Sequence, residues 1–214
     1  MLLSELIFRT YLTYTPRGTS AIAKQAQQDM LAIKNEKMHR ELKIPASEFF
    51  VNMIKENLKD LPFKHFFGED VHLTPVPKSA LMRPGTLWVS QKIAEELSKH
   101  GLGMVLPCLE RLHAVPKSAT SQSENRPKAI DHYNTIRVKT TVQRPTKIVL
   151  IDDVVTRGAT LLGCASLLKE AFPGASIFGF AIVRTMSEEG SFKQIMDPCI
   201  GTIELRNSNT FRNP

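Results

Sequence analysis

The sequence of 214 residues is poor in cysteine and contains no long hydrophobic run. Its three cysteines, Cys108, Cys164 and Cys199, lie far apart and form no C-x-x-C pair, which argues against a disulfide framework or a structural zinc ribbon. No stretch approaches the roughly 18–20 apolar residues that a membrane span needs. The N-terminal segment lacks a basic region followed by a small-residue cleavage site, so we expect no signal peptide. These absences predict a protein of the reducing cytoplasm with no membrane partner.

Basic residues outnumber acidic ones by 28 to 21, and the excess is concentrated in the middle of the chain. Residues 61–150 hold 13 of the basic and 7 of the acidic side chains, whereas the flanking segments are nearly balanced. Such an excess is typical either of an ordinary solvated surface or of a surface that meets an anionic partner. That partner would be a phosphate-rich small molecule or a nucleic acid, and charge alone does not separate the two.

The first 62 residues are expected to form a helical N-terminal extension. Apolar side chains recur at helical spacing over residues 19–43, and a second amphipathic pattern covers residues 46–58. This region carries no catalytic constellation, and whether it joins two chains in a homodimer is left open. The remaining residues, 63–214, are expected to form the functional domain.

Strand and helix patterns alternate in that domain. We expect strands over residues 71–77, 103–106, 133–138, 147–151 and 176–183, and helices over residues 87–99 and 158–172. The run KIVLI at 147–151 is nearly continuous and aliphatic, which is typical of a strand covered on both faces. A strand, a helix and a second strand in succession imply a right-handed parallel crossover, and so an α/β fold. Residues 113–132 have few large apolar side chains and predict a long loop of the kind that serves as a lid.

The segment Val149–Thr160 (VLIDDVVTRGAT) carries the chemistry. A buried strand delivers Asp152 and Asp153 to its carboxyl end, where parallel sheets bind ligands. Thr156, Gly158 and Thr160 then lead into a helix whose first backbone N–H groups can bind a phosphate, and the glycine permits close approach. One sugar phosphate fits this arrangement, with its phosphate in the loop and its ribose hydroxyls on the carboxylates.

Three other interpretations compete for the same residues. Nucleoside triphosphatases also place acidic residues after an aliphatic strand, but the G-x-x-x-x-G-K-[ST] loop that they need is absent. Receiver domains begin with a similar strand, but too few residues follow this one to complete such a domain. The third alternative is an ordinary helix start at which Asp153 and Thr156 act only as caps.

The run IVLIDDVVTRGAT closely resembles the phosphoribosyl pyrophosphate (PRPP) motif of type I phosphoribosyltransferases. The resemblance implies a Rossmann-like parallel sheet flanked by helices, with Asp152 and Asp153 on the ribose 2′ and 3′ hydroxyls. It also implies a loop around the 5′-phosphate, formed by Thr156, Arg157, Gly158, Ala159 and Thr160.

The surroundings of the motif are similar to the competence-associated, ComF-like branch of this family. The likeness spans about residues 70–185 and rests on the V-P step at Val76-Pro77 and on weaker equivalents of R-G-x-N-Q and R-x-x-N. It implies a pyrophosphate loop that comprises Val76, Pro77, Lys78 and Ser79, with Arg83 within reach of the same oxygens. It further implies that the 113–132 loop is a mobile hood whose basic members are Lys117, Arg126 and Lys128. Each of these basic residues can also be an ordinary solvated charge.

Two features depart from that branch. The N-terminal cysteine ribbon is missing, and Pro84 and Thr86 interrupt the R-G-x-N-Q pattern. Arg157 is similar to its equivalent in amidophosphoribosyltransferases, but the chain lacks their N-terminal cysteine nucleophile and is too short for a glutaminase domain. The acceptor substrate is therefore not identified by the resemblance.

The resemblance implies a Mg²⁺-dependent transfer of phosphoribosyl from PRPP to a nitrogen acceptor, with release of pyrophosphate and with the metal bound through PRPP. The alternative is a non-catalytic protein that senses PRPP or a nucleotide, or that associates with nucleic acid. His72, His113 and His132 stand in no recognisable pairing, so none of them is expected to act in catalysis. Trp88 is expected to pack in the core.

Overall fold

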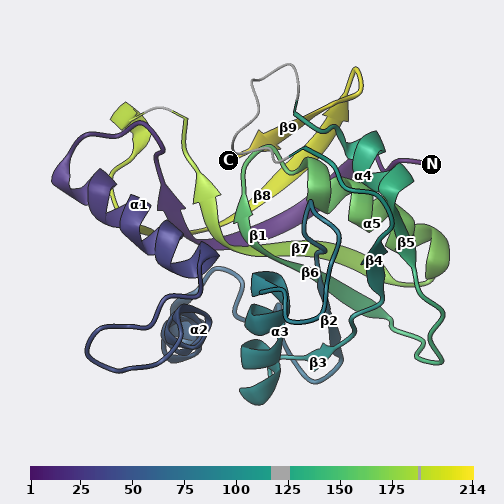
Figure 1. Cartoon of the computed structure of the whole chain (residues 1–214), viewed down its shortest axis with the longest axis horizontal. Coiled ribbons are helices and arrows are strands. Elements are labelled where there is room, and N and C mark those ends of the chain that lie inside the picture. Colours follow the sequence, from purple (N-terminus) through teal and green to yellow (C-terminus); the bar gives the residue numbers. More distant parts are fainter. Residues whose placement is uncertain (117–125, 188) are drawn as a thin grey trace.

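The computed structural model describes residues 1–116, 126–187 and 189–214. A seven-stranded sheet in the order β3-β2-β6-β7-β1-β8-β9 crosses the molecule, with helices on both faces (Figure 1). Its strands are β1 (Glu5–Tyr14), β2 (Val71–Pro75), β3 (Met104–Val105), β6 (Lys147–Val155), β7 (Ser176–Thr185), β8 (Met196–Arg206) and β9 (Asn209–Asn213). The first five strands of this order are mutually parallel, and β8 and β9 are antiparallel to their neighbours. The predicted α/β class is therefore confirmed.

The helices are α1 (Ala21–Lys34), α2 (Ala46–Asn57), α3 (Val89–Lys99), α4 (Ala129–Thr135) and α5 (Ala159–Ala171). A small second sheet pairs β4 (Leu109–Arg111) with β5 (Ile136–Val138). Figure 1 shows α1, α2 and α3 on one side of the main sheet and α4 and α5 on the other. No helix in the described part of the chain is both long and apolar enough to cross a membrane.

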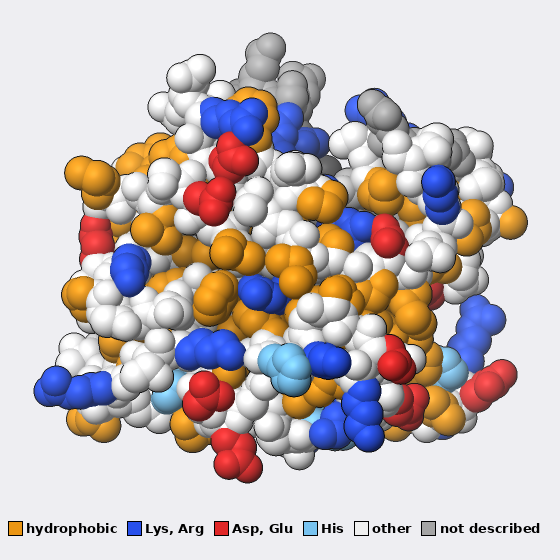
Figure 2. All heavy atoms as spheres, turned by 180° about the vertical axis from the view of Figure 1, so that it is seen from behind, with side chains coloured by type: hydrophobic (Ala, Val, Ile, Leu, Met, Phe, Trp, Pro, Cys, Tyr) orange, Lys and Arg blue, Asp and Glu red, His pale blue; other side chains and the backbone are white. Residues whose placement is uncertain are grey.

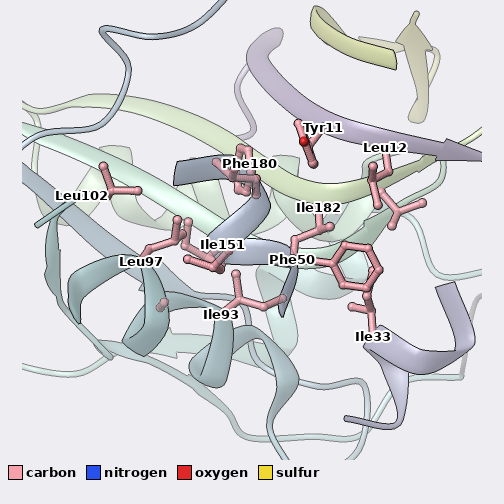
Figure 3. Packing of buried hydrophobic residues seen from close by; sticks show 14 of the residues in the cluster. Tyr11, Leu12, Ile33, Phe50, Ile93, Leu97, Leu102, Ile151, Phe180 and Ile182 are labelled. Atoms are coloured by element: carbon pink, nitrogen blue, oxygen red, sulfur yellow. The ribbon is translucent and has the colours of Figure 1, made fainter. Parts of the chain in front are cut away.

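Two apolar layers hold the helices against the sheet. In one layer α1, α2 and α3 cover one face, and Figure 3 shows Ile93 and Leu97 of α3 against Ile151 and Phe180 of the sheet. In the other layer α5 covers the opposite face, where β6 contributes Ile148 and Leu150. The side chains of β6 at 148–151 are fully buried because consecutive residues of a strand point to opposite faces. This confirms the doubly covered strand that was predicted from the aliphatic run.

The chain leaves β2 and β6 in opposite directions along the sheet. From β2 it passes through α3 to β3 on one side, and from β6 it passes through α5 to β7 on the other. Because β2 and β6 are neighbours, their carboxyl ends flank a topological switch point, where parallel sheets form a ligand crevice.

The expectation of an entirely helical segment over residues 1–62 is wrong for residues 5–14. These residues form β1, which lies inside the sheet between β7 and β8. Phe8 and Tyr11 are fully buried there, one on each face, so this aromatic and β-branched run suits a covered strand. The two predicted helices are present as α1 and α2, but α1 ends at Lys34 rather than at residue 43.

The predicted 113–132 loop is also only partly correct. Residues 129–135 form α4, so the strand that was expected over 133–138 is reduced to β5. The Asp131 carboxylate accepts the backbone N–H of Lys128 at 2.8 Å and satisfies a donor at the helix start. Lys117 lies outside the described residues.

We expect a fragment of residues 63–214 to fail to fold on its own, because removal of β1 separates β8 and β9 from the parallel strands. Circular dichroism and thermal unfolding of the fragment and the full chain test this, and cooperative unfolding of the fragment would contradict the expectation.

Within the full chain, Phe8→Ala should lower the free energy of unfolding by about 3–5 kcal/mol, because it truncates a large buried side chain. Ile7→Ala on the same strand is the control, because Ile7 is 37% exposed, and it should cost clearly less.

Candidate functional site

Strand β6 extends beyond its neighbour β2 at the switch point. The β2–β6 pairing ends at Pro75 and Ile151, where the Val76 N–H donates to the Ile151 carbonyl at 2.9 Å. On its other side β6 stays paired with β7 as far as Val155. The β2-facing edge of residues 152–155 is therefore open, and it borders the crevice.

Asp152 and Asp153 lie on this open part of β6, and both are half-buried. The Asp152 carboxylate accepts the backbone N–H of Asp153 at 2.9 Å and the Ser90 hydroxyl at 3.4 Å. The Asp153 carboxylate accepts the backbone N–H of Val154 at 2.8 Å. Loss of solvent, and then the charge of Asp153, raise the pKa of Asp152 well above its usual range. Two kinds of partner therefore stabilise the negative charge of the pair: a cation, and hydroxyl groups that donate hydrogen bonds.

Gly158 sets the turn between β6 and α5. Its φ is 82°, in the left-handed region, and a Cβ at this position would lie 2.4 Å from Cδ1 of Ile203 on β8. No side chain caps α5 in the described part of the chain. The backbone N–H groups of the first turn of α5 thus lack a capping oxygen, which makes this turn suited to an anion.

A cavity of about 310 Å³ lies over this helix start and is lined by all five of the predicted phosphate-binding residues. Arg126 and Lys128, which were expected in the hood, line the same cavity, as do Asn209 and Thr210 of β9. Its lining includes Asp152, Thr156, Arg157, Gly158, Ala159 and Thr160. The carboxylate and the anion-binding turn, adjacent in the sequence, therefore face one space.

A second cavity of about 420 Å³ adjoins the first, and the two share Asp152, Val154, Thr156 and Thr160. Both carboxylates line it, together with the C-terminal end of α1, at Lys34 and Asn35. The β2–α3 loop that was expected to bind pyrophosphate also lines it, with Val76, Pro77, Lys78 and Ser79.

The two basic residues of the predicted pyrophosphate loop differ in their placement: Lys78 lines the second cavity but its ammonium is engaged, and Arg83 lies away from both cavities. The Lys78 ammonium donates to the Leu87 carbonyl at 2.9 Å, and Arg83 is exposed and lines neither of these two cavities. Trp88 is half-buried, and its indole N–H donates to the Val76 carbonyl at 2.8 Å, which holds the loop against α3. The expectation that Trp88 packs in the core is therefore wrong: it belongs to neither buried apolar cluster, and it fixes the loop instead.

Arg111 and His132 are site residues that the sequence interpretation missed. Both are nearly fully buried, and both line the second cavity. His132 lies between Arg111 and Thr160, at 3.1 Å and 3.2 Å, although no pairing was recognisable for it in the sequence. Burial, and then the charge of Arg111, lower the pKa of His132 to about 4. The imidazole is therefore neutral at physiological pH.

The C-terminal hairpin β8–β9 supports the phosphate loop, and nothing in the sequence indicated this. Arg212 of β9 donates from Nε to the Thr156 carbonyl at 2.6 Å and from Nη2 to the Thr185 carbonyl. Burial, and then the nearby Arg184 charge, lower the pKa of Arg212 to about 10, so it stays charged at neutral pH. The hairpin thus fixes the turn that precedes α5.

Among the described residues, no group of three or more His, Cys, Asp or Glu side chains could hold a metal ion. At the crevice the Asp152–Asp153 pair offers carboxylate oxygens, which suit Mg²⁺ when the bound ligand supplies further oxygens. No protein-family model matches the chain, and no curated protein matches it either.

Gly158→Ala should destabilise the fold by about 2–4 kcal/mol, because a left-handed φ and a clash with Ile203 act together. Gly174→Ala is the control, since a Cβ there meets nothing within 4 Å. Urea unfolding of the two variants measures the difference. Equal stabilities would show that the turn does not depend on glycine.

Asp152→Asn should raise the thermal midpoint at pH 7.5 by about 2 °C or more. A raised pKa means that the ionised carboxyl destabilises the folded state above the unfolded-chain pKa, and this destabilisation fades as the pH falls toward about 4. The gain should therefore shrink at pH 4.5. Exposed Asp60→Asn is the control, and melting curves at both pH values decide. A loss of stability at pH 7.5 would contradict the interpretation.

Proposed function

We propose that the protein binds PRPP and transfers its phosphoribosyl group to a nitrogen acceptor, with Mg²⁺ and with release of pyrophosphate. One observation carries this proposal: two adjacent carboxylates and an uncapped, glycine-started helix turn line a crevice of two adjoining cavities at the switch point of the sheet. Sugar phosphates present the matching groups, a phosphate for the turn and vicinal hydroxyls for the carboxylates. The resemblance of residues 148–160 to the PRPP motif supports the same assignment.

The two adjoining cavities suit the two ends of PRPP. The 5′-phosphate would occupy the smaller cavity, at the start of α5, where Arg126, Lys128 and Arg157 also line the space. The ribose would lie at the shared residue Asp152, and the pyrophosphate would lie in the second cavity, against the loop at residues 76–79. The acceptor would enter the same cavity from the side of α1.

The chain's own residues act in this reaction by positioning and by charge. Departure of pyrophosphate from C1 leaves a cation-like ribose ring, and the fixed charges of Asp152 and Asp153 stabilise it. Asp153 N–H and Ser90 hold the Asp152 carboxylate in place, so little reorganisation is needed during the reaction. Mg²⁺, held by these carboxylates and by PRPP oxygens, would neutralise charge on the leaving group.

A specific observation favours the alternative of binding without turnover. Of the three Lys and Arg residues that line the second cavity, Lys34, Lys78 and Arg111, the last two are engaged with the Leu87 and Lys78 carbonyls, respectively. A leaving group in that cavity would then meet few free cations. Nucleic-acid association has less support: on the face shown in Figure 2, basic side chains are interspersed with acidic and apolar ones and form no continuous band.

Calorimetry with PRPP and Mg²⁺ tests the proposal. Wild type should bind, and the Asp152→Asn/Asp153→Asn double variant should bind at least about tenfold more weakly, since charge-assisted hydrogen bonds are lost. Asp60→Asn should match the wild type, because Asp60 is exposed and lines neither cavity. Absence of PRPP binding by wild type, or equal binding by the double variant, would refute the proposal.

Pyrophosphate release separates the two alternatives. The protein is incubated with PRPP, Mg²⁺ and a panel of bases and amines. Release that depends on one acceptor, and that the double variant loses, identifies a transferase. Tight PRPP binding without release on any acceptor identifies a sensor.

A further inference from the structure

A chain of buried hydrogen bonds runs from Arg111 through His132 to Thr160. Arg111 donates from Nε to the Lys78 carbonyl, from Nη1 to the Thr135 hydroxyl at 2.8 Å, and from Nη2 to Nδ1 of His132 at 3.1 Å. Nε2 of His132 lies 3.2 Å from the hydroxyl oxygen of Thr160. Arg111 and His132 are 4% and 2% exposed, so water cannot readily replace these partners.

The chemistry of arginine determines the tautomer of His132. A guanidinium has donors only, so Nδ1 of His132 must present its lone pair to Arg111. The neutral imidazole then carries its hydrogen on Nε2 and donates it to the Thr160 oxygen. An imidazolium would place an N–H against the guanidinium, and the neutral state that burial favours avoids this.

The donation from His132 decides which way the Thr160 hydroxyl points. Its oxygen accepts from His132, and the structure shows no other hydrogen bond of this hydroxyl among the described residues. The carbonyl four residues earlier, at Thr156, accepts the Arg212 N–H. The Thr160 hydrogen is therefore available to a ligand at the first turn of α5, where Thr160 lines both cavities.

We propose that Arg111 and His132 are positioning residues that turn the Thr160 hydroxyl into a hydrogen-bond donor for the ligand phosphate. This assignment rests on the proposed function, because it takes a phosphate as the occupant of the turn. It adds two residues that the PRPP motif does not contain. The pair also connects the β2–α3 loop with the first turn of α5. Arg111 is bound to the Lys78 carbonyl of the loop, and His132 is bound to Thr160 of the helix.

The contact between α4 and α5 makes this chain of hydrogen bonds possible. A Cβ at Gly163 of α5 would lie 2.6 Å from the Ala129 carbonyl and 2.9 Å from Cβ of His132. Only glycine therefore lets α4 approach closely enough for His132 to reach Thr160, one helical turn earlier on α5.

The tautomer is tested without any ligand. Nitrogen–proton correlation spectra of the histidine side chains at neutral pH distinguish the two neutral forms and the imidazolium, and His132→Gln assigns the His132 signals by their absence. We expect a hydrogen on Nε2 and none on Nδ1. A hydrogen on Nδ1, or an imidazolium, overturns the positioning role and leaves the proposed function unaffected.

A double-mutant cycle tests whether His132 acts through Thr160, with calorimetry of PRPP and of ribose 5-phosphate. His132→Leu should weaken both ligands about 3- to 10-fold, the effect of one hydrogen bond. His132→Gln, which keeps an N–H donor, should recover most of the loss. In a Thr160→Val background, His132→Leu should have no further effect beyond about twofold.

The matched control cycle pairs His132→Leu with Thr156→Val, because among the described residues the Thr156 hydroxyl makes no hydrogen bond with His132, and there the effects should add. Thermal unfolding of each variant checks that it is folded. Additive effects of His132→Leu and Thr160→Val would overturn the positioning role alone. Failure of wild type to bind either ligand would instead overturn the proposed function, and the assignment of a phosphate with it.

Discussion

The open edge of β6 beyond Ile151 is the constraint on which the candidate site depends. A strand inside a parallel sheet normally has both edges paired, but here β2 ends first and leaves residues 152–155 without a neighbour on one side. Two carboxylates occupy this edge, and they would be costly in a fully paired and covered position. Along the chain the carboxylates are followed by the glycine turn and then by the start of α5. These three features therefore surround one crevice.

The surroundings of that edge are held by residues that do not themselves carry the proposed chemistry. Arg212 binds the carbonyl of Thr156, Trp88 binds the carbonyl of Val76, and Arg111 binds the carbonyl of Lys78. The β2–α3 loop and the turn before α5 are thus each fixed through backbone oxygens. Loops fixed in this way suit a site that acts by positioning rather than by covalent chemistry.

Strand β1 makes the N-terminal residues part of the main sheet. It pairs with β7 and β8, so among the described strands β1 alone connects the hairpin β8–β9, which supports the phosphate turn, to the rest of the sheet. The end of α1, which follows β1 along the chain, reaches the second cavity at Lys34 and Asn35. The region that was expected to be a helical extension therefore takes part in the sheet and borders the site.

Features that depend on neighbouring residues could be predicted from the sequence: the doubly covered strand at 147–151, a helix over 158–172, and the succession of Asp152, Asp153 and Gly158. Local patterns are sufficient there because hydrophobic burial and turn geometry act over a few residues. The contact of His132 with Thr160, 28 residues away, and that of Arg212 with Thr156, 56 residues away, depend on how distant elements pack. Such contacts produce no recognisable pattern of residue spacing in the sequence, because they form where separate elements pack. Residues 5–14 were misassigned for the same reason, because partners on β7 and β8 make that apolar run a central strand.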